Sequence, residues 1–367
     1  MKALVVGGTG PTGPHLVRGL LARGYEVAIF HRGTHESDEI PPEVEHIHGD
    51  PHFVETIEAA LGQRRFDLAL VTYGRLRHLS GALRGKVTRL IAVGGVAVYR
   101  GYKEPERLVP AGMLVPTREE DPRVDDPGEL AFARLMTDTE DALFRDHPTA
   151  TLFRYPYVYG PHQLIPREWC VIRRILDGRR HIVVPEGGLA LATHGYAANL
   201  AHAVLLAVDQ PEASSGQAFN CGDERTLTIR QLIEVICRTM EAELEVVSVP
   251  NEAAIPARAL SMREDANHWV MDITKLKTQL GYRDLVDPIE AIRLTVQWYL
   301  KNRPERGGEI EQRLADPFDY AAEDRIIEIQ KSAVRQMLDV EVRGGSERRP
   351  HAYAHPKSPG ERDHRAR

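Results

Sequence analysis

The beginning of the chain alternates between apolar runs and an amphipathic segment. Ala3–Val6 is a continuous apolar run, the pattern of a parallel strand that is buried on both faces. A glycine-rich segment follows, and between Pro14 and Gly24 apolar residues recur at helical spacing, namely Leu16, Val17, Leu20 and Leu21. Residues 25–30 are again mostly apolar. The pattern predicts a strand, a tight loop, a helix and a second strand.

The same alternation continues beyond this segment. Apolar runs predict further strands at residues 44–48, 68–72, 89–93 and 150–153, and amphipathic segments predict helices at residues 53–61 and 129–145. Residues 73–86 leave room for one brief helix at most. Strands that alternate with helices in this way predict an α/β protein with a Rossmann-type, doubly wound parallel sheet.

The remaining chain predicts a smaller C-terminal lobe. It combines residues 164–176 with helices at 227–240 and 287–301 and a strand at 245–249, while residues 193–201 return to the sheet. We therefore expect a sheet domain at residues 1–160 with about 190–222, and a lobe at residues 161–189 and 223–317. A helical extension at 318–342, with its helix at 323–338, and a polar tail at 343–367 complete the predicted organisation.

Composition narrows the class of protein. The 367 residues are 42% hydrophobic, which is enough for a sizeable core, and the formal charge of −6 makes a nucleic-acid partner unlikely. Cys170, Cys221 and Cys237 are too few and too scattered for a disulfide framework. The apolar start is too short for a signal-peptide core, and no run is long enough to span a membrane. These features predict a cytoplasmic protein.

The glycine-rich segment carries the strongest chemical signal. Gly7-Gly8-Thr9-Gly10-Pro11-Thr12-Gly13 lies between a predicted strand and a predicted helix. A glycine loop there lets backbone amides approach a pyrophosphate, which also meets the positive end of the helix dipole. The sequence therefore predicts a dinucleotide site that uses the following residues of the loop: Gly7, Thr9, Gly10, Pro11, Thr12 and Gly13.

The end of the second strand bears on the choice of cofactor. An NAD site usually has Asp or Glu about 20 residues after the glycines, whereas this chain has His31-Arg32-Gly33. A guanidinium pairs well with the additional phosphate of NADP. Glu36 and Asp38 come slightly later and leave NAD open if the loop folds back. Arg32 therefore favours NADP over NAD, with a solvated loop residue as the alternative.

A family resemblance rests on four segments in order. They are the glycine motif at 7–13, Gly49-Asp50, Val98-Tyr99, and Tyr155-Pro156-Tyr157-Val158-Tyr159-Gly160-Pro161. In this order they resemble the extended short-chain dehydrogenase/reductases, the NAD-dependent epimerase/dehydratase family, over roughly residues 1–300. Residues 216–222 resemble the family's return strand, and within the family the chain is most similar to atypical, chloroplast stem-loop-binding-like members.

The resemblance implies an NAD(P)-binding enzyme that acts on a small organic substrate, with a homodimer left open. We expect the cofactor site to be completed by residues at later strand ends: Asp50, Tyr73, Gly74, Val93, Tyr155 and Pro156. Asp50 is the expected contact of the adenine. The short segment at 73–86 argues against the family's usual dimer.

The positions of the family's catalytic residues carry other side chains. The Ser or Thr after the fifth strand aligns with Gly95, and the Tyr and Lys of the following helix align with Phe132 and Met136. None of these replacements ionises, so the usual acid for hydride transfer is absent at these positions. Tyr99, Tyr102 and His78 are the candidates for a re-sited catalytic group. Each also fits a packing or surface residue.

Other polar residues past the strand ends predict the substrate site, namely Arg75, Tyr157, His162, His194 and Tyr196. His46 and His48 share one strand face near Asp50 and His52, but no further ligand of suitable spacing follows them, so we expect no metal.

Three functional classes follow in order of preference. The first is an oxidoreductase or epimerase with a re-sited acid. The second is an isomerase or lyase that keeps the dinucleotide as a scaffold, and the third is a non-catalytic dinucleotide sensor or an RNA-binding protein.

Overall fold

The computed structural model describes residues 1–33, 38–72, 74–126, 128–261, 267–341, 356 and 358–362. The chain divides into two compact units, Met1–Asp319 and Tyr320–Arg367. In the second unit, helix α13 spans Tyr320–Leu338 and contains the helix predicted at 323–338. Most of the predicted polar tail lies outside the described residues.

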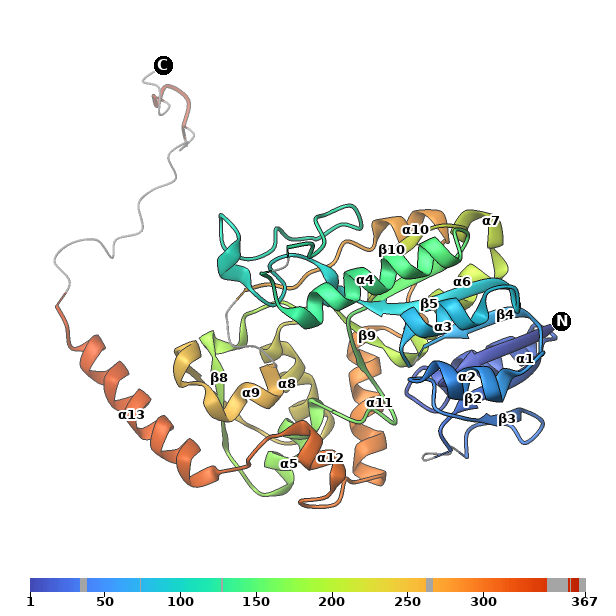
Figure 1. The fold of residues 1–367 in the computed structure, drawn as a ribbon. Coiled ribbons are helices and arrows are strands. Elements are labelled where there is room, and N and C mark those ends of the chain that lie inside the picture. Colours follow the sequence, from blue (N-terminus) through green and yellow to red (C-terminus); the bar gives the residue numbers. More distant parts are fainter. Residues whose placement is uncertain are drawn as a thin grey trace. The chain divides into compact units, whose positions relative to one another are not determined.

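A parallel sheet of seven strands forms the centre of the first unit, in the order β10-β6-β5-β4-β1-β2-β3 (Figure 1). The strands are β1 Lys2–Val6, β2 Glu26–His31, β3 Glu45–His48, β4 Phe66–Val71, β5 Val87–Gly95, β6 Thr151–Tyr155 and β10 Ala218–Asn220. From β1 the chain builds β2 and β3 on one side and β4, β5 and β6 on the other. This reversal opens a crevice at the carboxyl ends of β1 and β4, where such sheets bind ligands.

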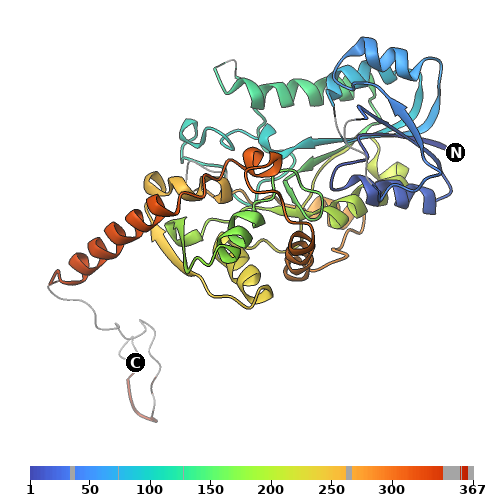
Figure 2. The same ribbon diagram turned by 90° about the horizontal axis from the view of Figure 1, so that it is seen from below.

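Helices cover both faces of the sheet, as Figure 2 shows. Helices α1 Gly13–Ala22 and α6 Ala197–Asp209 pack together with one face of β1 and β2. Helices α2 Val54–Leu61, α3 Leu76–Leu83 and α4 Ala131–Asp146 share the core of the other face. Because both faces of the sheet are covered, the central strand β1 is buried and apolar from Ala3 to Val6, which explains its continuous apolar run in the sequence.

The smaller lobe has its own apolar core around Trp169, Ile233 and Tyr299. Four strands lie outside the seven-stranded sheet, namely β7 Tyr157–Tyr159, β8 His181–Pro185, β9 His194–Tyr196 and β11 Glu245–Val249, so residues 194–196 pair with β7 and not with the large sheet. Strand β7 pairs with β9, and β8 pairs with β11, both in parallel. The remaining helices are α5 Glu168–Leu176, α7 Pro211–Ser214, α8 Ile229–Thr239, α9 Arg258–Ser261, α10 Thr274–Gln279, α11 Pro288–Lys301 and α12 Glu309–Leu314.

The predicted fold class is confirmed, because the sheet is parallel, doubly wound and covered by helices on both faces. The predicted short helix before β5 is α3, and the strand at 245–249 has the predicted bounds. Within Met1–Asp319, the division into sheet domain and lobe stays a prediction, since these residues group as one unit. In the described parts of the chain, no helix is long and apolar enough to cross a membrane.

Candidate cofactor and substrate site

The glycine loop turns sharply between β1 and α1. Gly7 and Gly8 have φ angles of 106° and 87°, which side-chain-bearing residues rarely adopt. A Cβ on Gly13 would lie 2.1 Å from the Gly8 carbonyl oxygen, so this position has no room for any side chain. The loop therefore brings backbone close to the first turn of α1, where the amide groups point away from the helix and attract an anion.

A cleft of about 1200 Å³ opens over this loop. The loop residues from Gly7 to Gly13 form its floor, and residues 31–33 at the end of β2 form one wall. Tyr155 and Val158 line the opposite end, together with His162, Gln163, Leu164 and Arg313 from the smaller lobe. A cleft that runs from the β2 end across the loop to the β6 end has the shape that an extended dinucleotide requires.

One acidic residue of the loop after β2, Glu39, is bound to other side chains. Glu39 accepts a hydrogen bond from Arg18 and lies 2.6 Å from His162 Nε2. The contact joins the loop after β2 to the loop after β7. Burial opposes ionisation, but hydrogen bonding by His162 and the nearby charges leave the pKa of Glu39 below its ordinary value. Arg32 lines the cleft, whereas Glu36 lies outside the described residues.

The other predicted cofactor residues are distributed more widely. Tyr155 lines the cleft, and Tyr73 lies outside the described residues. Asp50 binds its neighbour His52 through both the backbone amide and the ring Nδ1. Four residues predicted for the cofactor site are not among the described residues that line the cleft: Asp50, Gly74, Val93 and Pro156.

Of the three residues aligned with the catalytic trio, Gly95 and Met136 are neighbours in the structure. A Cβ on Gly95, at the end of β5, would come within 2.9 Å of Met136 Cε and 3.7 Å of the Tyr155 carbonyl oxygen. Phe132, one helical turn earlier on α4, exposes 58% of its surface. The carboxyl end of β5 thus meets an apolar thioether and an exposed aromatic ring.

Charged groups do lie beneath this apolar surface, but they bind one another. Arg154 on β6 donates to both carboxylate oxygens of Glu140 on α4, at 2.9 and 2.8 Å. The same guanidinium donates to the Tyr99 hydroxyl, which in turn donates to Asn220 Oδ1 at 2.6 Å. Burial raises the pKa of Tyr99 to about 12. The first-named catalytic candidate therefore lies in a closed internal network, which argues against it as a proton donor.

Tyr102 lies in a different environment. Its ring stacks on Trp269, with centroids 4.1 Å apart, and the Lys103 ammonium lies 5.5 Å from the Tyr102 ring. The guanidinium of Arg167 is buried and feels the charge of both Tyr102 and Tyr157. Burial lowers the pKa of Arg167, and the charges of Tyr157 and Tyr102 oppose that shift.

Two predicted substrate residues adjoin this group. The Arg167 guanidinium carbon lies 3.9 Å from the centroid of the Tyr157 ring, and that ring meets His194 edge-on at 5.4 Å. Tyr102, Lys103, Arg167, Tyr157, His194 and Trp269 are hereafter called the aromatic–cationic cluster. Tyr196 packs on Tyr159 beside it, at 5.5 Å. Arg167 and Trp269 are buried within this cluster, whereas Tyr102, Tyr157 and His194 are partly exposed and Lys103 is exposed.

His78 and Arg75 lie elsewhere. His78, on α3, faces the carbonyl oxygen of His52 at 3.2 Å, and Arg75 lies over the ring of Phe53. Both therefore neighbour the segment after β3, and the structure does not bring them together with Tyr157 and His194. His162 lines the dinucleotide cleft instead of the cluster.

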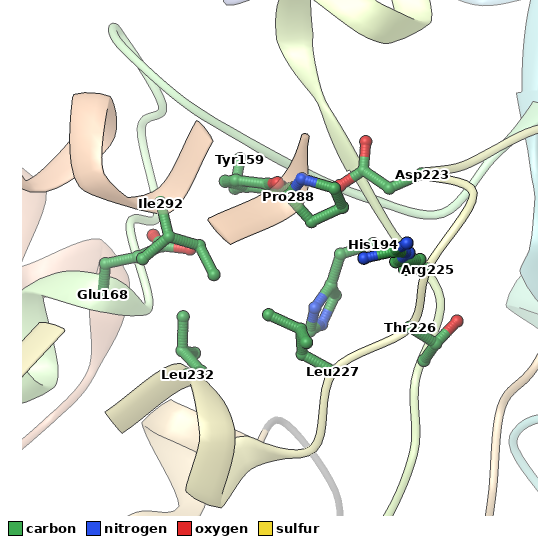
Figure 3. A pocket seen from close by; sticks show the side chains of 10 residues that line it. All are labelled: Tyr159, Glu168, His194, Asp223, Arg225, Thr226, Leu227, Leu232, Pro288 and Ile292. Carbon is green, nitrogen blue, oxygen red and sulfur yellow. Dashed lines mark hydrogen bonds between the residues drawn. The ribbon is translucent and has the colours of Figure 1, made fainter. Parts of the chain in front are cut away.

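A separate cavity of about 340 Å³ lies on the other side of β7, because Val158 lines the cleft and its neighbour Tyr159 lines the cavity. Figure 3 shows Glu168 and His194 on opposite sides of this cavity. Glu168 exposes 2% of its surface, its Oε2 has no hydrogen-bond partner, and burial raises its pKa to about 7. Asp223 accepts from Tyr159, Tyr196 and Asn199, and burial raises its pKa to about 6.

Sequence reasoning missed several of these residues. No motif marked the neighbours Arg167 and Glu168, nor Trp269, which lies about a hundred residues later in the chain. The Tyr-Pro-Tyr-Val-Tyr run did single out the strand against which Arg167 packs. Arg313 is contributed to the cleft by α12, which no pattern linked to the glycine loop.

Comparison with known proteins gives a consistent result. Residues 132–222 match the model of the NAD dependent epimerase/dehydratase family. The chain is 26% identical over 310 residues to the chloroplast stem-loop binding protein of 41 kDa b of Arabidopsis thaliana, which covers 79% of this chain and 77% of that protein.

Solved structures agree in fold. UDP-glucose 4-epimerase from Thermotoga maritima, solved with UDP-glucose, matches with a TM-score of 0.66 and 20% identity over 83% of this chain and all of that one. The Bordetella bronchiseptica enzyme WbmG, solved in complex with NAD, matches with a TM-score of 0.65 and 18% identity over 82% and 94% of the two chains.

Proposed function

The chain resembles the NAD-dependent epimerase/dehydratase family in its fold and in residues 132–222, and on that premise we propose that it is an NADP-binding enzyme with a re-sited proton donor. The observation that carries the proposal is the cleft of about 1200 Å³ between the glycine loop, Arg32 and the smaller lobe. Its substrate is a small organic molecule that binds between this cleft and the aromatic–cationic cluster.

The preference for NADP rests on the β2 end. His31 and Arg32 line the wall where the ribose of the adenosine half is expected. Glu39, the acid that could bind two ribose hydroxyls, is held by Arg18 and His162. Arg32 offers a guanidinium to the additional phosphate of NADP, and NAD has no group there to use it.

The substitute acid is Tyr102, supported by its place in the aromatic–cationic cluster. Tyr99 is buried and its hydroxyl donates to Asn220, while His78 neighbours the segment after β3. The charge of Tyr102 acts on the Arg167 guanidinium, so an acid and a cation interact here, and the aligned Phe132 and Met136 provide neither.

The test begins with the protein as purified. Mass spectrometry of the released small molecules should find NADP or NADPH together with a co-purified metabolite. In calorimetric titration NADPH should bind more tightly than NADH, and Arg32→Asp should remove the difference. The control is Arg118→Asp, because Arg118 is 65% exposed and outside the cleft. Equal affinities in the parent protein would reject the NADP preference.

The role of Tyr102 is tested with that co-purified metabolite. Tyr102→Phe should lower its turnover by about 10²–10⁴-fold with unchanged NADPH affinity, the usual cost of removing a positioned acid. The matched variant Tyr99→Phe should lower stability more than it lowers turnover, because its hydroxyl is part of the buried network. Full activity of Tyr102→Phe would reject this assignment.

Similarity to a stem-loop binding protein supports RNA binding as a second candidate. With a formal charge of −6, we expect binding to be weak and sensitive to salt. A gel-shift titration with one structured RNA at physiological salt decides this. A tight complex that resists salt would place RNA binding ahead of catalysis.

A further inference from the structure

Three histidines come together at the carboxyl ends of β2 and β3. The two strands pair in parallel with His31 opposite His48 and Ile29 opposite His46. Side chains on a strand alternate between faces, so His46 and His48 share the face on which His31 also lies. The ring of His31 lies 5.0 Å from each of the other two rings, between centroids.

The ring nitrogens are spaced as metal ligands require. His31 Nε2 lies 3.1 Å from His46 Nδ1, and one ring nitrogen from each of the three residues falls within 4.8 Å of the others. Ligands at zinc–nitrogen distances of about 2.0–2.1 Å in a tetrahedron are about 3.3 Å apart. The first pair already has this spacing, and small rotations of the His48 ring, which is exposed, complete the set.

We propose that His31, His46 and His48 bind one first-row divalent transition metal ion, with Zn²⁺ as the reference ion. Imidazole is a ligand that suits Zn²⁺, Cu²⁺ and Ni²⁺, whereas Mg²⁺ and Ca²⁺ prefer oxygen. His31 is buried and His48 is exposed, so the fourth position faces solvent and takes water.

The prediction of no metal site rests on the lack of a further ligand after His46 and His48 in the sequence. The third ligand comes before the pair, and strand pairing places it.

Metal binding at this site breaks one hydrogen bond of His31. Its Nδ1 accepts a hydrogen bond from the Gly33 amide at 3.2 Å, which places the ring proton on Nε2. A metal on Nε2 moves that proton to Nδ1, so the Gly33 hydrogen bond opens when the ion binds. Gly33 also lies against His48, since a Cβ on it would be 2.6 Å from His48 Nδ1. Ion binding therefore acts on the backbone directly after Arg32, in the wall of the dinucleotide cleft.

The experiment uses the full chain without a histidine tag, treated with a chelator and then dialysed. Calorimetric titration with Zn²⁺ should give one equivalent per chain, and Mg²⁺ should give no heat. His46→Ala and His48→Ala should each weaken Zn²⁺ binding by at least about 10–100-fold, the loss typical of removing even a residue that only supports a ligand. The control is His181→Ala, because His181 lies on β8, away from the three histidines, and pairs with Glu245 on β11.

Folding is checked by comparing thermal midpoints of the metal-free variants, and His48→Ala serves as the main variant because its side chain is exposed. Visible absorption of bound Co²⁺ gives a second reading of imidazole ligation, and it should disappear in the same two variants. Absence of stoichiometric Zn²⁺ binding, or binding that survives both substitutions while His181→Ala reduces it, would overturn the proposal.

Discussion

The two halves of the sheet's carboxyl edge are built for different tasks. At the β1–β2 half, the glycine loop presents backbone amides, and Arg32 at the end of β2 adds a charged side chain to the cleft. At the β5–β6 half, Gly95 and Met136 meet where the family resemblance places ionisable groups. The charged residues of this half, Arg154 and Glu140, are 4% and 3% exposed and bind each other.

The difference shows that binding and chemistry make separate demands on one fold. A dinucleotide is held by backbone geometry, which glycines at fixed spacing provide whatever the surrounding sequence. Proton transfer needs a group whose pKa lies near the working pH and whose polar atom is accessible. A chain can therefore keep the first property while its catalytic positions carry glycine, phenylalanine and methionine.

The largest effect is expected from restoring the aligned trio. Gly95→Ser, Phe132→Tyr and Met136→Lys in one protein should create carbonyl reductase activity, about 10²–10⁴-fold above the parent. The changes must be combined, because a Cβ on Gly95 approaches Met136 Cε to 2.9 Å. Activity is measured as NADPH oxidation with simple ketones and nucleotide sugars. The Phe132→Tyr single variant, which lacks the cation, is the control and should stay inactive.

Strong reduction by the unmodified protein would contradict this part of the comparison. It would show that another residue of the β5–β6 half already supplies the acid for these substrates. The alignment of Phe132 and Met136 with the family's helix would then need another register.

The next effect concerns the buried pair beneath these positions. Glu140→Gln removes the charge that compensates Arg154, whose side chain is 5% exposed. Loss of one partner of a buried ion pair costs about 3–5 kcal/mol in the free energy of unfolding. Urea denaturation measures it. The matched control is Asp141→Asn on the same helix, whose carboxylate is 58% exposed, where the cost should stay below about 1 kcal/mol.

An unchanged unfolding midpoint in Glu140→Gln would contradict the structural role of the pair. Glu140 would then be free to take part in chemistry, and the contrast between the two halves would weaken.

A smaller effect is expected in the glycine half. Gly13→Ala places a Cβ 2.1 Å from the Gly8 carbonyl oxygen, so the loop must shift away from its binding geometry. Overpacking of this kind costs about 1–3 kcal/mol, which corresponds to a loss of about 10–100-fold in NADPH affinity. Gly81→Ala is the control, because the nearest atom to its Cβ would be 3.9 Å away. Unchanged affinity in Gly13→Ala would show that the cofactor does not use this loop.

The sequence predicted the glycine half well because its signals are local. The apolar run of β1, the glycines and the helical spacing of α1 follow one another within residues 2–22, and the alternation of strands with helices predicted a parallel, doubly wound sheet. Eight of the predicted cofactor residues line the cleft, namely Gly7, Thr9, Gly10, Pro11, Thr12, Gly13, Arg32 and Tyr155, and their role in cofactor binding stays a prediction.

Long-range contacts set the limit of that prediction. Tyr99 is one of two tyrosines predicted as the substitute acid because they follow β5, yet its hydroxyl bonds to Asn220, more than a hundred residues later. Trp269 and Arg167 join Tyr102 from segments whose sequence carries no period or motif for the contact. A polar side chain can take part in catalysis only where its polar atom is accessible, and a buried one instead bonds to other groups of the protein. Burial depends on neighbours that are distant in sequence.

The last prediction concerns Glu168, the acid behind β7 that is not tied into an ion pair. Burial raises its pKa to about 7, above its ordinary 4.5, so the folded protein keeps this proton to higher pH than the unfolded chain does. The stability it contributes is complete below about pH 4.5 and is lost as the pH rises through 7. Between pH 5 and pH 8 the loss amounts to about 2 kcal/mol.

Glu168→Gln does not titrate, so its free energy of unfolding should lack this fall, whereas the exposed-residue control Glu234→Gln should retain it. Urea denaturation at both pH values gives the two slopes. Equal slopes in the parent protein and Glu168→Gln would show that the carboxyl ionises freely, and the half of the molecule beyond β5 would then hold no acid tuned toward neutrality at this position.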